Sequence, residues 1–255
     1  MKKFGLLGRK LGHSYSPQIH ALIGDYDYKL YEKEPEEVEE FVKSGELKGM
    51  NVTIPYKKDV IPFCDRLSSQ AKKIGAVNVI IREDDGSLTG HNTDYYGFQY
   101  MIKAANADVK GKKAIVLGDG GASLTVQTVL KDLGAKSIGV ISLFDDENNY
   151  DNLYKHYDAQ IIVNATPVGM YPNVNDKIID LEPFTRCEAV LDLIYNPKKT
   201  MLLKQADELC ISNANGILML IAQAKKGAEY FFNKEIDDSI IEKIAEELEV
   251  WNFCV

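Results

Sequence analysis

The chain has 255 residues, of which 45% are hydrophobic and 27% are charged, and its formal net charge at pH 7 is −8. These proportions are typical of a globular enzyme, and the length suits two domains better than a single core. The acidic surface argues against nucleic acid or an anionic membrane as a partner, and no run of about 18 apolar residues predicts a transmembrane helix.

Short apolar strands alternate with amphipathic helices along the first part of the chain, which is the pattern of an α/β fold. Strands are expected at residues 4–8, 26–31, 49–54 and 76–81, and helices at 17–23, 35–43 and 93–107. Ser16 is expected to cap the first of these helices, with Pro17 in the first helical position. The turn at residues 84–86 predicts a hairpin that spans residues 77–88.

A polar segment, residues 108–113, indicates a crossover into a second domain with a parallel sheet. Its strands are expected at residues 114–117, 137–142, 161–164 and 190–193, and its helices at 124–133 and 148–157. From residue 216 onward the pattern predicts two helices, at 217–232 and 237–248.

The segment Asn51–Lys57 is the most informative one in the chain. Pro55 has no N–H for a sheet ladder, so the strand ends there and the next turn carries Lys57 toward a cleft. An arbitrary lysine is far more often a solvated surface residue. A second segment, Gly90–Asp94, opens a helix and offers the Asp94 carboxylate as a partner, which favours a functional lysine.

A glycine-rich turn, Gly118–Ser123, lies between a buried strand and a helix. This order is typical of a dinucleotide-binding turn, in which the glycines let the backbone approach a pyrophosphate at the helix N-terminus. Ser123 replaces the third glycine, however, and Asp119 puts a carboxylate where an anion should bind. On local evidence alone, an ordinary tight turn remains the alternative.

The cysteines and histidines show no spacing that favours a disulfide framework or a metal site. Cys64, Cys187, Cys210 and Cys254 form no C-x-x-C pair, and the four histidines form no cluster. In a chain of this size the pattern indicates reduced thiols and a cytoplasmic location. The N-terminal segment is too short and too soon interrupted for a signal peptide. We therefore expect a cytoplasmic protein without a metal ion.

Seven motifs, taken together, resemble the shikimate dehydrogenase family, which includes quinate/shikimate dehydrogenases. In chain order they are His13–Pro17, Asn51–Lys57, Gly75–Asn78, Asn92–Asp94, Gly118–Ser123, Asn164–Pro167 and Asn215–Ala224. Any one of them can arise by chance, but all seven in the family's order are very specific, and they span essentially the whole chain.

The resemblance implies an α/β fold with two domains and an active cleft between them. The substrate-binding domain would comprise residues 1–107 and be completed by the helices of residues 216–255, and a Rossmann-like NAD(P)-binding domain would comprise residues 108–215. The implied reaction is the reversible reduction of 3-dehydroshikimate to shikimate in chorismate biosynthesis. The expected partner is this small substrate, and the expected assembly is a monomer or a homodimer.

By the same resemblance Lys57 and Asp94 are the catalytic pair. A hydride that leaves carbon must be matched by a proton that leaves oxygen, and a positioned amine can relay that proton. The positions that match the family's substrate contacts are Ser14, Ser16, Asn51, Thr53, Asn78, Thr93, Tyr195 and Gln223. Serine and tyrosine hydroxyls suit a carboxylate, whereas amide and threonine side chains suit ring hydroxyls.

The cofactor half matches the family less closely. The implied contacts are Gly118, Asp119, Gly120, Gly121, Ala122, Asp145, Asn164, Thr166, Leu193 and Gly216. Where NADP-dependent members carry an arginine for the 2′-phosphate, this chain has the segment 142–144 followed by Asp145, and Leu124 replaces another arginine. The expected cofactor is NAD or NADP, with NAD favoured because Asp145 can accept hydrogen bonds from free ribose hydroxyls.

The nucleotide domain is also expected to be smaller than usual, because only about twenty residues separate Ser142 from Asn164. The alternative to an active dehydrogenase is a catalytically slow paralogue that binds shikimate-like acids as a sensor or interaction module.

Overall fold

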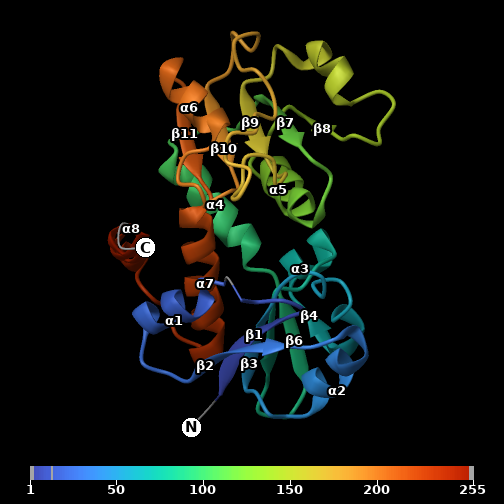
Figure 1. The fold of residues 1–255 in the computed structure, drawn as a ribbon. Coiled ribbons are helices and arrows are strands. Elements are labelled where there is room, and N and C mark those ends of the chain that lie inside the picture. The colour runs from blue at the N-terminus through green and yellow to red at the C-terminus, as the bar shows by residue number, and fades with distance from the viewer. Residues whose placement is uncertain (1–2, 13, 253–255) are drawn as a thin grey trace. The chain divides into compact units, whose positions relative to one another are not determined.

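The structure, a computed structural model, describes residues 3–12 and 14–252, so His13 and Cys254 lie outside the described residues. The chain divides into two compact units, Met1–Tyr96 with Ile221–Val255 and Gly97–Leu220. The boundaries fall inside helices α4 (Asp94–Ala104) and α7 (Ile217–Phe232), whereas the expected domain boundaries lie just beyond the ends of these helices (Figure 1). Within the described residues, no helix is long and apolar enough to cross a bilayer.

A six-stranded mixed sheet forms the centre of the first unit, with the strand order β2-β1-β3-β5-β6-β4. The strands are β1 (Phe4–Gly8), β2 (Tyr28–Glu32), β3 (Gly49–Val52), β4 (Arg66–Leu67), β5 (Val79–Arg82) and β6 (Leu88–His91). β1 pairs in parallel with both β2 and β3, and β5 pairs antiparallel with β3 and β6. The expected hairpin is therefore confirmed as β5–β6.

The two faces of this sheet are covered by different helices. On one face Leu7 and Met50 pack with Phe41 of α2 (Val38–Lys43). On the other face the Phe4 ring stacks on Phe231 of α7, with 4.6 Å between the ring centroids. A Cβ on Gly49 would lie 2.8 Å from the Phe231 ring, so glycine lets α7 approach β3 closely. The remaining α-helices of this unit are α1 (Ser16–Ile23), α3 (Ser69–Ile74) and α8 (Ser239–Asn252).

The start of α1 differs from the sequence prediction. Tyr15 is the N-cap residue and makes no side-chain capping bond, and Ser16 is already helical. Ser14 Oγ accepts a hydrogen bond from Ser16 N at 3.2 Å, so the serine before the helix makes the turn at its start. The prediction that Ser16 caps this helix is wrong, because Ser16 lies inside the helix and its backbone N–H is taken up by Ser14, two residues earlier.

The second unit contains a five-stranded parallel sheet with the order β11-β10-β9-β7-β8. Its strands are β7 (Lys113–Leu117), β8 (Ser137–Ile141), β9 (Ile161–Asn164), β10 (Ala189–Asp192) and β11 (Ser212–Asn215). Because β8 and β9 lie on opposite sides of β7, the sheet has a topological switch point at the carboxyl end of β7, where ligands bind in such folds.

Helices α5 (Gly121–Asp132) and α6 (Met201–Glu208) connect strands of this sheet. α6 and β11 were not expected from the sequence. The expected helix at residues 148–157 is instead a run of 3₁₀ turns over Tyr150–His156, capped by the Asn149 side chain.

Candidate active site

Lys57 and Asp94 meet in the first unit. The turn after β3 is closed by a hydrogen bond from Tyr56 N to Thr53 O at 3.0 Å, and the Lys57 carbonyl accepts one from Val77 N at 2.7 Å. Asp94 begins α4, where a carboxylate is favoured by the helix dipole. Lys57 Nζ donates to Asp94 Oδ2 at 2.7 Å, and the two side chains are 31% and 15% exposed. The structure thus forms the predicted ion pair and leaves it reachable by a ligand.

Three further predicted residues form one hydrogen-bond network beside this pair. Thr93 N donates to Asn78 Oδ1 at 2.7 Å, and Asn78 Nδ2 donates to Thr93 Oγ1 at 3.0 Å. Thr93 Oγ1 also lies 3.5 Å from Gln223 Oε1 on α7. Thr93 is fully buried, and its part in substrate binding stays a prediction.

The other predicted substrate residues of the first unit lie near the start of α1 and the end of β3. Asn51 is buried, and its Oδ1 accepts a hydrogen bond from the Tyr28 hydroxyl at 2.8 Å. Ser14, Ser16 and Thr53 are half-buried. Tyr195 belongs to the second unit and is 36% exposed, so its part in substrate binding stays a prediction.

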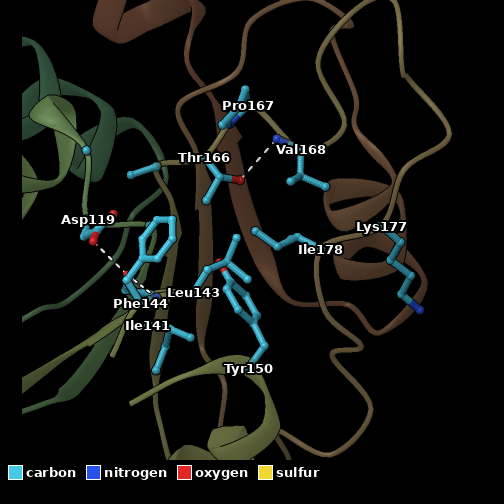
Figure 2. A pocket seen from close by; sticks show the side chains of 14 residues that line it. Asp119, Ile141, Leu143, Phe144, Tyr150, Thr166, Pro167, Val168, Lys177 and Ile178 are labelled. Atoms are coloured by element: carbon cyan, nitrogen blue, oxygen red, sulfur yellow. Dashed lines mark hydrogen bonds between the residues drawn. The ribbon is translucent and has the colours of Figure 1, made fainter. Parts of the chain in front are cut away.

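The second unit has a cavity of about 530 Å³ at the carboxyl ends of β7, β8 and β9. Predicted residues Gly118, Asp119, Gly120 and Thr166 line it (Figure 2). The remaining lining residues are Ile141, Ser142, Leu143, Phe144, Tyr150, Ala165, Pro167, Val168, Lys177 and Ile178. The walls are mostly apolar, as expected for a site that takes a planar, largely apolar ligand group.

The glycine turn at this cavity has the geometry that a phosphate needs. Gly118 has φ +98°, and a Cβ there would lie 2.7 Å from Thr166 Cγ2. Gly120 is the N-cap of α5 and supplies no side-chain bond to the first turn. A Cβ on Gly120 or Gly121 would meet nothing within 4 Å, so the start of α5 is open on the side of these residues. The backbone N–H groups at a helix start bind a pyrophosphate well.

Comparison with known proteins identifies the relatives of this chain. Residues 6–80 match the family model described as the shikimate dehydrogenase substrate binding domain. The chain is 38% identical to the shikimate dehydrogenase (NADP(+)) of Clostridium perfringens, over 97% of this chain and 98% of that protein. The chain belongs to the shikimate dehydrogenase family.

Solved structures of the shikimate dehydrogenase family agree with this assignment over nearly the full length. Shikimate dehydrogenase 1 from Peptoclostridium difficile is 39% identical, with a TM-score of 0.84 and 98% of each chain covered. The shikimate 5-dehydrogenase from Listeria monocytogenes, solved in complex with shikimate and NAD, is 29% identical, with a TM-score of 0.82 and 96% of each chain covered.

Several residues that the family resemblance assigned to the cofactor lie outside the lining of the cavity. Gly121 and Ala122 begin α5. Asn164 is buried and holds Thr166, because its Oδ1 accepts hydrogen bonds from Thr166 N and Oγ1 at 3.0 and 2.7 Å. Its Nδ2 in turn donates to Asp192 Oδ1 at 3.0 Å, and burial raises the pKa of Asp192 to about 6.

Asp145, Leu193 and Gly216 also lie outside that lining. Asp145 Oδ1 accepts hydrogen bonds from Glu147 N at 2.8 Å and Asn148 N at 2.7 Å, and these bonds lower the pKa of Asp145. The Asp145 carboxylate is thus used by its own turn. A Cβ on Gly216 would lie 2.1 Å from the Leu193 carbonyl oxygen, so this glycine permits a close backbone approach.

The carboxylate that does line the cavity is Asp119. Ser142 Oγ donates to Asp119 Oδ2 at 2.7 Å and accepts a hydrogen bond from Phe144 N at 3.2 Å. Tyr150 lies near enough that the Asp119 charge adds to burial in raising the pKa of the Tyr150 hydroxyl. Sequence reasoning missed Tyr150. The signal that could have marked this wall is the exposed apolar pair Leu143 and Phe144, which follows the end of β8 after Ser142.

Proposed function

We propose that this protein is a shikimate dehydrogenase, which reversibly reduces 3-dehydroshikimate to shikimate with a nicotinamide dinucleotide. The observation that carries the proposal is the Lys57–Asp94 pair, formed at 2.7 Å beside the network of Asn78, Thr93 and Gln223. We assign substrate binding to the first unit, and cofactor binding to the cavity and glycine turn of the second.

When bound, the nicotinamide supplies the hydride for reduction or accepts it in oxidation. Residues of this chain transfer the proton that accompanies the hydride. Lys57 Nζ donates a proton to the carbonyl oxygen as 3-dehydroshikimate is reduced, and takes it back as shikimate is oxidised. Asp94 orients the amine through the 2.7 Å hydrogen bond and balances its charge.

The substrate is a small ring acid with a carboxylate and several hydroxyls, and the first unit offers matching groups. We assign Ser14 and Ser16 to the carboxylate. We assign Thr53, Asn78 and Gln223 to the ring hydroxyls, which both donate and accept hydrogen bonds.

We further infer that NAD is preferred to NADP, although the Clostridium perfringens relative is named for NADP(+). Among the fourteen residues that line the cavity, Lys177 is the only basic one, and Figure 2 shows its side chain pointing away from Asp119. A 2′-phosphate would therefore face the Asp119 carboxylate without a cation. Unit charges about 4 Å apart repel by roughly 1 kcal/mol in water, and a phosphate carries nearly two of them.

Steady-state kinetics test both parts of this proposal. Shikimate is added to the purified protein with NAD or with NADP, and the reduced nicotinamide is followed by its absorbance at 340 nm. We expect turnover of shikimate with a higher kcat/KM for NAD. No turnover with either cofactor contradicts the enzyme assignment, whereas a tenfold preference for NADP contradicts only the cofactor preference.

A further inference from the structure

A group of three aromatic residues, the buried His20 and the partly buried Tyr26 and Tyr28, lies beside Asn51 in the first unit, and the proposed reaction does not use it. His20 on α1 is 1% exposed, and its ring stacks on Tyr28 of β2 with 3.8 Å between the centroids. His20 Nδ1 lies 2.5 Å from the Tyr26 hydroxyl, and the Tyr28 hydroxyl donates to Asn51 Oδ1 at 2.8 Å. These contacts connect α1 and β2 to the end of β3.

The direction of each hydrogen bond in this group follows from the state of His20. Burial lowers the pKa of His20 to about 3, so the imidazole is neutral and has one donor and one acceptor nitrogen. The neighbouring Asn51 side chain raises the pKa of His20, which is the effect of a hydrogen-bond acceptor. Because Nδ1 faces Tyr26, the donor toward Asn51 is Nε2–H, and Nδ1 accepts from the Tyr26 hydroxyl.

The Asn51 amide is thereby held in one orientation. Its Oδ1 accepts a hydrogen bond from the Tyr28 hydroxyl at 2.8 Å, so its Nδ2 points the other way. Asn51 is 5% exposed, and within residues 3–12 and 14–252 no acceptor pairs with Nδ2. A Cβ on Gly227 would lie 3.1 Å from this Nδ2, so glycine lets α7 pack closely against the Asn51 amide. Nδ2 is not among the fully buried side-chain atoms that lack a partner, so it keeps contact with solvent and an acceptor on a ligand can reach it.

We propose that His20 and Tyr28 are positioning residues that fix Asn51 as an N–H donor to the substrate carboxylate. The inference rests on the proposed shikimate dehydrogenase function. The carboxylate is the matching group because it only accepts hydrogen bonds, whereas a ring hydroxyl also donates and would not require one amide orientation. The Ser16 side chain also acts on the Tyr28 hydroxyl, so the serine expected at the carboxylate lies beside the same residue.

Tyr28→Phe tests the proposal because it removes only the hydroxyl. Tyr31→Phe is the matched control, since Tyr31 lies on the same strand and packs against Phe41 with 5.0 Å between the centroids. KM and kcat are measured for shikimate and for its methyl ester, in which the carboxylate is masked. We expect Tyr28→Phe to raise KM for shikimate at least about fivefold, with kcat within about twofold and KM for the ester nearly unchanged.

An equal change in KM for shikimate and for the ester, or none in either, overturns the proposal. A rise in KM of the same size in Tyr31→Phe also overturns it, because the effect would then be general to the strand.

Nuclear magnetic resonance of the wild-type protein gives a second readout that does not depend on turnover. We expect ¹⁵N shifts of His20 that show protonation at Nε2, and a shift of the Asn51 side-chain amide protons when shikimate is added without cofactor. If shikimate binds and this amide does not respond, the proposal fails. If the amide responds but no hydride transfer occurs with NAD or NADP, the binding inference stands and the dehydrogenase assignment fails.

Discussion

The stability of the first unit should depend on pH through His20. In the folded protein burial lowers the pKa of His20 to about 3, whereas an unfolded chain has the ordinary value of 6.5. Between these two values the unfolded state binds a proton that the folded state does not, so the free energy of unfolding falls as pH falls. The slope approaches about 1.4 kcal/mol per pH unit, which gives about 2.5 kcal/mol between pH 7.5 and 4.5.

The measurement compares the wild-type protein with His20→Asn, which packs a neutral amide in the same place. Urea unfolding is followed through amide resonances of β1 and β3, so that the first unit is observed by itself. Carboxylates contribute to the acid loss in both proteins and cancel in the difference. We expect the wild type to lose about 2.5 kcal/mol more than the variant over this range. Equal losses would show that His20 is not held neutral in the fold.

Three further predictions concern the proposed site. Lys57→Ala should lower kcat for shikimate oxidation by roughly 10²- to 10⁴-fold with a much smaller change in KM, and a variant that keeps half the wild-type turnover rules Lys57 out of the proton transfer. Ser14→Ala with Ser16→Ala should raise KM for shikimate at least about tenfold and leave cofactor affinity near the wild-type value, because charge-assisted hydrogen bonds to the carboxylate are lost. Asp119→Asn should shift the ratio of kcat/KM for NADP over NAD upward by about tenfold, while Asp145→Asn, the control, should not. Equal shifts in both variants contradict the assignment to Asp119.

The elements that could be predicted from the sequence are those with a clear local pattern of hydrophobic or turn residues. The apolar run at 114–117 and the hairpin turn at 84–86 led directly to β7 and to the β5–β6 hairpin, because burial on both faces and a tight turn leave a clear local pattern. β11 was missed since its residues, Ser212–Asn215, are polar and small and resemble a loop. Their place in the sheet depends on pairing with β10, which no local pattern encodes.

The site was predicted where a motif carries the geometry and missed where three-dimensional contacts decide it. The predicted strand end at Pro55 is wrong, because β3 ends at Val52, but Lys57 still lies just after the turn that follows the strand. Asp94 begins α4 as predicted, so the two motifs sufficed to find the pair. Asp145 has a suitable side chain at a suitable spacing, but its own turn takes its carboxylate, and Asp119 lies at the cavity instead. The contact between His20 and Asn51 joins residues far apart in sequence, and no spacing rule indicates it.

The packing of the late helix α7 on the N-terminal sheet affects the order in which the two units fold during synthesis on the ribosome. The second unit is one continuous stretch, Gly97–Leu220, so it can fold as soon as it has emerged. The N-terminal 96 residues emerge first, yet Phe4 lacks its stacking partner Phe231, and Thr93 lacks Gln223, until the last part of the chain has been synthesised. The first unit is therefore begun first and completed last, and a nascent chain released before α7 would carry a folded second unit and an open hydrophobic sheet face.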